Sequence, residues 1–383
     1  MKTALFSTSN SLTRWPYQKL GWTGFDIGCH EIRMAQVEDT SDGWSIHNAW
    51  TLGYHNTPNQ DQSPDPSNGS ERFVWISPEG LIESGLRSVE SELRKLGNVF
   101  SGRNCAVSLH DGMMDYREIA VPRGDNEEMH SMAHSEVLLE SGSDADAWIS
   151  RCWEIRSTNS SASNQAVMAT VSIKKHASYR FAEDLYRAGW QCRVLDAIPC
   201  ALARSSSMAT GNPQIPVLTL EMGYAQAILL VVIDGQPAMM RCLNKFGTKG
   251  LFEQVAAAFA ITSADAQTLL CHGKPGVRNQ LKDAFLEKQP LDPFLHSFAD
   301  GLCAELDRTL HYVELMEQNS VPVKILMSGA GTEVAALPSL IASKAPVETV
   351  PWSIPISGHV SMADKLPTFA IAAGLSALRW EAN

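Results

Sequence analysis

The chain has 383 residues, of which 44% are hydrophobic and 19% charged, so it is long enough for two or more folded domains with a sizeable core. Its formal net charge of −11 disfavours a broad nucleic-acid surface and direct binding to anionic lipid. No apolar run is longer than Ala227 to Ile233, which is too short to span a membrane, and Met1–Phe6 turns polar too soon for a signal peptide. Eight cysteines without a Cys-x-x-Cys spacing predict reduced thiols in a cytoplasmic protein.

The first part of the chain predicts a leader, two paired strands, a flexible polar loop and a helix that ends at a glycine. In chain order these are residues 1–20, Gly21–Gly28 with Arg33–Glu38, Gly53–Arg72, and Ser77–Gly97.

The next part predicts a small inserted module with the order β-β-α-β-β-α. Its elements are a hairpin of Asn104–Leu109 and Met114–Val121, a helix at Asp125–Glu140, strands at Ala147–Ile155 and Gln165–Ile173, and a helix at Lys174–Ala188. The turn His110-Asp111-Gly112 between the first two strands is the signal for the hairpin.

The second half of the chain repeats the first in outline. A strand at Gln191–Asp196 and a helix at Ile198–Ser207 lead to a break at Gly211-Asn212-Pro213. Beyond the break we expect a three-stranded meander, three helices, a buried strand and two more helices. These are Leu218–Leu220, Ala227–Ile233, Pro237–Cys242, Lys249–Ala260, Ser263–Cys271, Pro293–Gln318, Val323–Met327, Glu333–Lys344 and Pro367–Arg379.

Three glycine-containing turns carry the chemistry that the sequence offers. They are Asp26-Ile27-Gly28 followed by Cys29 and His30, then Glu221-Met222-Gly223, and finally Ser328-Gly329-Ala330-Gly331. Glycine lets backbone N–H groups approach a phosphate, and a carboxylate can hold Mg²⁺ through water. One interpretation is a site for ATP and Mg²⁺, with Asp26 and Glu221 as the metal contacts. The alternative at each position is an ordinary structural turn.

Several stretches, taken in order, resemble the PilM-like family of type IV pilus assembly proteins, and the chain is also similar to the cell-division protein FtsA. The stretches are Gly24–Gly28 with Glu31-Ile32-Arg33, the Val121–Gly124 step before an acidic helix at Glu127–Glu140, Lys174–Ala197, Glu305–Tyr312, Ile325–Gly331 and Ala370–Leu375. They cover residues 20–383, and their order and spacing carry the resemblance.

The resemblance implies an α/β, actin-like (ribonuclease H-like) fold with two lobes and a small inserted α+β subdomain. The implied division is a flexible leader 1–20, lobe 1 at 21–102 and 191–212, an inserted subdomain at 103–190, lobe 2 at 213–360, and a C-terminal helix in 361–383 that returns to lobe 1. It also implies that Ser328, Gly329 and Gly331 contact the adenosine. Glu305 and Arg308, one helical turn apart, would hold the ribose, with an intrahelical ion pair as the alternative.

By the same resemblance the chain is a cytoplasmic, nucleotide-binding scaffold of a type IV pilus or related secretion system. It would dock the cytoplasmic tail of a PilN-like inner-membrane protein in a groove between the inserted module and the first lobe. That partner would hold it at the inner membrane without insertion, and no nucleic-acid partner is expected. Nucleotide would set the angle between the lobes and so the shape of the groove. Self-association is left open.

Departures from the family pattern keep two other hypotheses open. Glu221 stands where the superfamily carries Asp, and Cys29-His30-Glu31 stands where the family prefers small hydroxylated residues. One hypothesis is an ATPase or phosphotransferase of the same fold, although sugar kinases need a further catalytic Asp that the sequence does not offer. We therefore expect slow turnover at most. The other hypothesis is a degenerate adaptor that no longer binds nucleotide.

Overall fold

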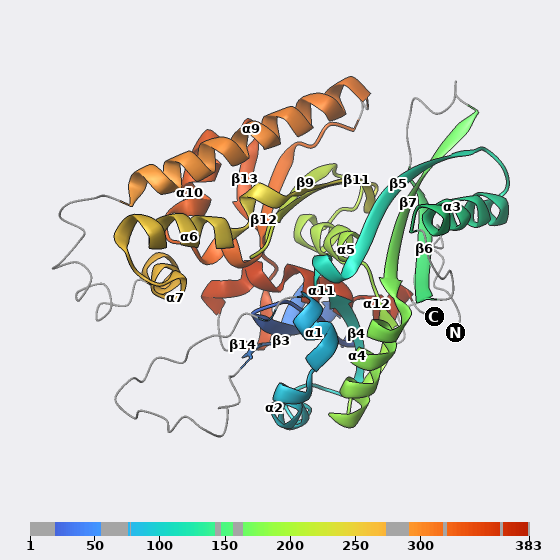
Figure 1. Ribbon diagram of the computed structural model, residues 1–383, viewed down its shortest axis with the longest axis horizontal. Helices are drawn as coiled ribbons and strands as arrows, with labels where there is room; N and C mark the ends of the chain where they lie inside the picture. The colour runs from blue at the N-terminus through green and yellow to red at the C-terminus, as the bar shows by residue number, and fades with distance from the viewer. Residues whose placement is uncertain are drawn as a thin grey trace.

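The computed structural model describes residues 20–54, 76, 78–141, 147–155, 164–272, 291–316, 320–360 and 363–381. Residues 1–19 of the predicted leader and 55–72 of the predicted loop lie outside this part of the chain. The described strands form three sheets, and helices lie between and around them (Figure 1).

The first sheet has six strands in the order β14-β3-β2-β1-β4-β8. β1, β2 and β3 form an antiparallel meander, and β4 and β8 run parallel to β1. β1 is buried along its whole length because it lies in the middle of this sheet. The strand bounds are β1 Thr23–Ile27, β2 Glu31–Thr40, β3 Gly43–Gly53, β4 Asn104–Leu109, β8 Gln191–Leu195 and β14 Ile356–Val360.

The second sheet has five strands in the order β11-β10-β9-β12-β13, which reproduces the order β3-β2-β1-β4-β8 of the first. The predicted repeat of the two halves is therefore present in the sheets. Asp234 and Gly235 join two of these strands with φ angles of 53° and 71°, as a two-residue hairpin turn requires. The bounds are β9 Val217–Met222, β10 Ala227–Ile233, β11 Gln236–Leu243, β12 Lys324–Ser328 and β13 Glu348–Pro351.

A third sheet has three strands in the order β5-β7-β6 and lies at one end of the molecule with helix α3 (Figure 1). Its core joins Ile119 and Val121 of β5 to Met129, Ala133 and Val137 of α3. The bounds are β5 Met114–Pro122, α3 Asn126–Ser141, β6 Trp148–Ile155 and β7 Gln165–Lys174.

The predicted hairpin of Asn104–Leu109 with Met114–Val121 is wrong. β4 lies between β1 and β8 in the first sheet, whereas β5 pairs with β7 in the third. The five residues Cys105–Leu109 are buried in succession, which is typical of an inner parallel strand and not of a two-stranded hairpin. The third sheet therefore begins at Met114, while the division into lobes and an inserted subdomain stays a prediction.

A two-helix layer, α5 (Ile198–Thr210) and α11 (Ala370–Ser376), separates the two large sheets. α11 packs on β1, β2 and β4, and α5 packs on β9, β10 and β11. The packing is close enough to require glycine. A Cβ added to Gly374 would lie 1.9 Å from the Ala201 carbonyl oxygen, and one added to Gly24 would lie 1.9 Å from that of Ala372.

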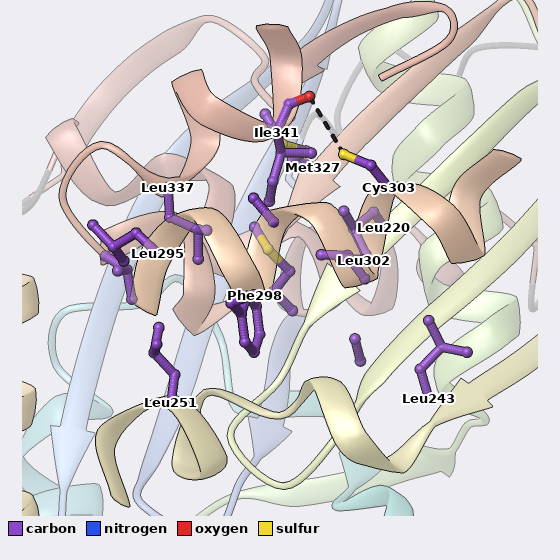
Figure 2. Packing of buried hydrophobic residues seen from close by; sticks show 14 of the residues in the cluster. Leu220, Leu243, Leu251, Leu295, Phe298, Leu302, Cys303, Met327, Leu337 and Ile341 are labelled. Atoms are coloured by element: carbon purple, nitrogen blue, oxygen red, sulfur yellow. Dashed lines mark hydrogen bonds between the residues drawn. The ribbon is translucent and has the colours of Figure 1, made fainter. Parts of the chain in front are cut away.

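Helices also cover the outer faces of both large sheets. On the first sheet these are α1 (Pro78–Ser84), α2 (Glu90–Leu96) and α4 (Lys175–Arg187). On the second sheet α6 (Thr248–Phe259), α7 (Ser263–Gln267), α9 (Asp292–Met316) and α10 (Leu337–Lys344) enclose an apolar core. Figure 2 shows Phe298 and Leu302 of α9 packed among Leu220, Leu337 and Ile341.

The C-terminal segment crosses back from the second sheet to the first. After β13, β14 adds to the edge of β3 in parallel register, and α11 and α12 (Leu378–Glu381) follow. Arg204 of α5 donates to the Gly374 carbonyl at 2.9 Å and pairs with Glu381 at 3.3 Å, which ties this segment to α5. None of the helices in the described part of the chain has the length and apolarity that a bilayer span needs.

Candidate functional site

The first glycine turn connects β1 to β2. The Gly28 N–H donates to the Glu31 carbonyl at 3.0 Å and closes the turn. Antiparallel register then places Arg33 opposite Asp26, with 3.7 Å between Nη1 and Oδ2. Arg33 Nη2 also lies 2.6 Å from Glu31 Oε1. The predicted metal contact Asp26 is thus already paired with a cation of its own hairpin.

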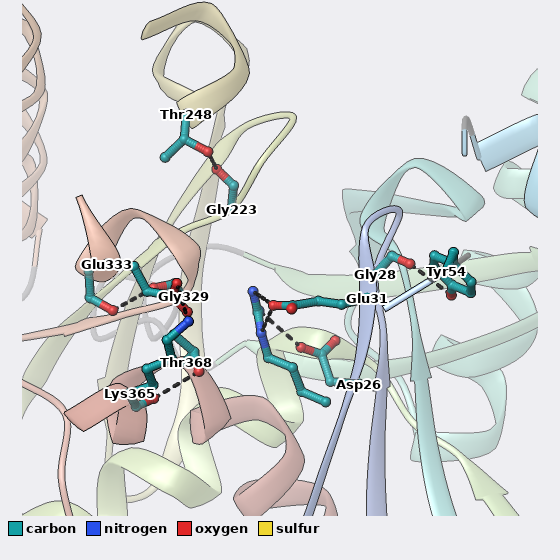
Figure 3. A network of polar contacts seen from close by, with 12 residues as sticks. Asp26, Gly28, Glu31, Tyr54, Gly223, Thr248, Gly329, Glu333, Lys365 and Thr368 are labelled. Carbon is teal, nitrogen blue, oxygen red and sulfur yellow. Dashed lines mark hydrogen bonds and ion pairs between the residues drawn. The ribbon is translucent and has the colours of Figure 1, made fainter. Parts of the chain in front are cut away.

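Arg33 is the cation at the centre of the site, and its side chain is only 12% exposed. Burial alone would lower the pKa of Arg33, but the surrounding carboxylates raise it above its ordinary value. These carboxylates come from both halves of the chain: Glu31, Asp26, Glu221 and Glu333. Figure 3 shows Asp26 and Glu31 facing the turn that carries Gly329 and Glu333.

The second glycine turn connects β9 to β10 and contacts the first residue of helix α6. The Thr248 N–H donates to the Gly223 carbonyl at 3.1 Å, and the Thr248 hydroxyl donates to the same oxygen at 3.4 Å, so the start of α6 is attached to this turn (Figure 3). Glu221, at the end of β9, is buried and accepts a hydrogen bond from Ser328 Oγ at 2.5 Å. The predicted adenosine contact Ser328 and the predicted metal contact Glu221 therefore bind each other.

The third glycine turn follows β12. Gly329 has φ +84°, and a Cβ there would lie 2.2 Å from Glu221 Oε1. A Cβ on Gly331 would lie 2.5 Å from that of Met222. Both positions require glycine for contact with the Glu221-Met222 segment. At this turn, the contacts therefore support the alternative of an ordinary structural turn.

An aromatic contact joins the first two turns. The rings of His30 and Tyr224 meet edge to face, with centroids 3.9 Å apart. Both imidazole nitrogens of His30 are buried, and neither has a hydrogen-bond partner among the described residues. Burial lowers the pKa of His30 from 6.5 to about 4, so the ring is neutral at pH 7. Next to it, Cys29 is buried and its carbonyl accepts from the Ile76 N–H at 2.9 Å.

Glu305 and Arg308 lie on α9, against the outer face of the second sheet. They form the predicted intrahelical ion pair at 2.8 Å, and Glu305 also pairs with Arg241 of β11 at 2.9 Å. Arg241 further donates to Thr309 at 2.5 Å. These contacts pair the charges of Glu305, Arg308 and Arg241 with one another. A role of Glu305 and Arg308 in ribose binding stays a prediction.

The residues as arranged do not fit a Mg²⁺ ion held jointly by Asp26 and Glu221. Each carboxylate is engaged elsewhere, and the described residues contain no group of three or more Asp, Glu, His or Cys side chains suited to a metal. Among the groups named here, four carboxylates outnumber two cations: Asp26, Glu31, Glu221 and Glu333 against Arg33 and Lys365. Such a balance opposes the entry of a polyphosphate.

Sequence reasoning missed four residues of this site: Arg33, Tyr224, Glu333 and Lys365. Lys365 pairs with Glu333 at 2.8 Å and holds the segment before α11 against the third turn. The signal for Arg33 was available, because counting outward from the Gly28 turn places residue 33 opposite residue 26. The other three depend on contacts between distant segments, which no local pattern records.

Comparison with solved structures identifies the architecture. The chain matches the "PilM-PilN type IV pilus biogenesis complex" with a TM-score of 0.63 and 18% identity, over 95% of this chain and 99% of that chain. The chain has the actin-like fold. The actin-like expectation is confirmed, and so is the resemblance to PilM, as a likeness of fold.

Two further structures with this fold match at lower TM-scores. One is the ethanolamine utilization protein EutJ from Carboxydothermus hydrogenoformans, with a TM-score of 0.48 and 10% identity over 93% of this chain and 89% of that chain. The other is a ROK family glucokinase from Streptomyces griseus in complex with glucose and AMPPNP, with a TM-score of 0.47 and 12% identity over 94% of this chain and 99% of that chain. No family model and no curated protein matches the chain.

Proposed function

We propose that this chain is a cytoplasmic assembly scaffold of a type IV pilus or a related secretion system, and that it docks the cytoplasmic tail of a PilN-like inner-membrane protein. The observation that carries the proposal is the actin-like fold shared with a PilM–PilN complex over nearly the whole length of both chains. The third sheet and α3 supply the inserted module beside which the tail would lie. The partner would then bring the chain to the inner membrane.

Within this proposal, the contacts between the three turns hold the two halves of the chain together, and the site does not turn over ATP. Arg33 supplies positive charge to carboxylates of both halves, and His30 packs on Tyr224 across the same interface. Excess negative charge and the Glu221–Ser328 hydrogen bond favour the nucleotide-free adaptor over the nucleotide-binding scaffold. ATP with Mg²⁺ remains the competing form of the proposal, because the glycine turns of the fold are retained.

Tail docking is tested with a labelled peptide from the cytoplasmic end of a PilN-like protein of the same organism. We expect saturable binding in fluorescence anisotropy, no binding of a scrambled peptide, and loss of membrane association in cells that lack the partner. Membrane association that persists without the partner, together with no peptide binding, would overturn the proposal.

The two forms of the proposal differ in their response to ATP. The adaptor shows no thermal shift with millimolar ATP and Mg²⁺, and its ATP turnover stays far below about 1 per second. The nucleotide-binding scaffold would be stabilised by about 2.7 kcal/mol at 100 times its dissociation constant. That stabilisation would disappear in Gly28→Val and Gly223→Val, where a Cβ meets carbonyl oxygens at 3.1 and 2.7 Å. Glu221→Asp, which restores the shorter carboxylate, would strengthen it.

A further inference from the structure

Two cysteines face each other on neighbouring strands of the first sheet, away from the site described above. Cys105 is the second residue of β4 and Cys192 the second residue of β8, and the two are direct partners in the parallel register. Cα atoms of such partners lie about 4.8 Å apart. A disulfide joins Cα atoms that are about 4.4–6.8 Å apart, so the backbone already has a compatible spacing.

The side chains of both cysteines lie in the same apolar cluster beside the first sheet. The interaction between the neighbouring thiols raises the pKa of Cys105 and lowers that of Cys192. Cys105 is fully buried, whereas Cys192 is partly exposed on β8, an edge strand of the sheet. A partly exposed thiol with a lowered pKa is the better attacking group, and a buried thiol in contact with it can resolve the product.

The strand geometry next to the pair supports this assignment of roles. The register shifts directly after Cys105 and Cys192, so Arg193 is an extra residue, and its side chain donates to Asn104 at 2.8 Å. The Cys192 thiol also lies 3.7 Å from the Val194 carbonyl oxygen, on the other side of this extra residue.

We propose that Cys105 and Cys192 form a reversible disulfide by exchange with a low-molecular-weight disulfide. The Cys192 thiolate attacks one sulfur of the small disulfide and releases one small thiolate, which takes up a proton. Cys105 then loses its proton, its sulfur attacks Cys192 Sγ, and the second small thiol leaves. Two protein thiols are oxidised, and one small disulfide is reduced to two thiols.

The bond would fix the start of β8, where the chain enters the first sheet directly after helix α4. α4 follows β7 of the third sheet without a break, so β8 is the return connection from that sheet. A disulfide at Cys192 would therefore tie this return connection to β4 and limit fraying of the sheet edge. The site is independent of the turns discussed above and of the proposed docking function.

The test uses the full-length, folded protein in glutathione buffers with stepped ratios of oxidised to reduced form. After acid quenching and alkylation, peptide mass spectrometry should show Cys105 joined to Cys192, in a fraction that rises with the ratio and reverses with excess reduced glutathione. Cys192→Ala should leave Cys105 reduced. Cys105→Ala should leave Cys192 as a mixed disulfide with glutathione.

Cys242→Ser is the matched control, since this exposed cysteine lies on the second sheet, and the variant should leave the Cys105–Cys192 link unchanged. The proposal is overturned if folded wild-type protein shows no such link at the most oxidising ratio. It is equally overturned if Cys192 links to a different cysteine, or if Cys105 is oxidised in Cys192→Ala. The wild-type measurement decides the matter even where a variant fails to fold.

Discussion

Arg33 is a buried guanidinium whose nearest charged groups are carboxylates of its own hairpin. Its contacts with Asp26 and Glu31 satisfy groups that would otherwise be desolvated without a partner. The net contribution of such a cluster to stability is small, but the loss of one member is costly because the remaining charges stay buried. This asymmetry gives a sharp prediction for a single substitution.

Arg33→Ala should lower the free energy of unfolding by about 3 kcal/mol or more, because Asp26 and Glu31 would lose their cation. Urea denaturation followed by fluorescence measures the change. Arg308→Ala is the control, since that side chain is 65% exposed and its ion pair should contribute about 0.5 kcal/mol or less. Equal effects of the two substitutions would show that Arg33 does not hold the site together.

His30 gives a pH prediction. In the unfolded chain its pKa is close to 6.5, whereas burial lowers the native value to about 4. Between these values the unfolded state binds more protons, so stability falls as the pH falls from 6.5 towards 4. His30→Phe keeps a ring against Tyr224 and should reduce the slope of unfolding free energy against pH in this window. A slope that is unchanged in His30→Phe would contradict the buried neutral ring.

At the scale of elements, the sequence predicts what is local. Strands β6 and β7 and helix α9 lie where alternation and helical spacing put them, because each pattern acts within one segment. The partner of a strand is a different matter. β4 is joined to β5 by a turn with hairpin-like residues, yet it pairs with β1 and β8, and residues 105–109 are buried in succession as in an inner parallel strand.

Prediction of the site from the sequence is limited in the same way. Asp26, Gly28, Glu221 and Ser328 stand out as motif residues, and the structure places them at the turns that were expected. Their bonds were not predictable, because the Ser328–Glu221 hydrogen bond joins residues 107 positions apart. Whether a carboxylate is available to a ligand depends on such contacts, and a motif does not record them.

Helix α11 offers an element-scale test of close packing. Gly374→Ala should lower the free energy of unfolding by about 1–3 kcal/mol or more, because its Cβ would meet the Ala201 carbonyl oxygen at 1.9 Å. Gly250→Ala in α6 is the counterpart, since nothing lies within 4 Å of the added Cβ. It should instead stabilise the protein by about 0.5–1 kcal/mol through helix propensity. Thermal unfolding of both variants measures the difference, and a tolerated Gly374→Ala would mean that α11 packs less closely on α5.

For the whole molecule, the C-terminal segment completes the first sheet and the layer between the sheets. Removal of residues 352–383 should leave the protein insoluble or without a cooperative thermal transition, because β14 and α11 are lost and the apolar faces of β1, β2 and α5 are exposed. A soluble shorter chain with the wild-type transition temperature would contradict this account.

The position of β14 has a consequence for how the protein is made. The second sheet is built from the continuous stretch 217–351, whereas β3 at Gly43–Gly53 pairs with Ile356–Val360. At ribosomal speeds of about 5–20 residues per second, β3 waits roughly 15–60 s for this neighbour. The half of the molecule that is synthesised first is therefore completed last. Until then the nascent chain carries an open strand edge. Aggregation is to be expected at this stage of synthesis, and a chaperone is then most useful.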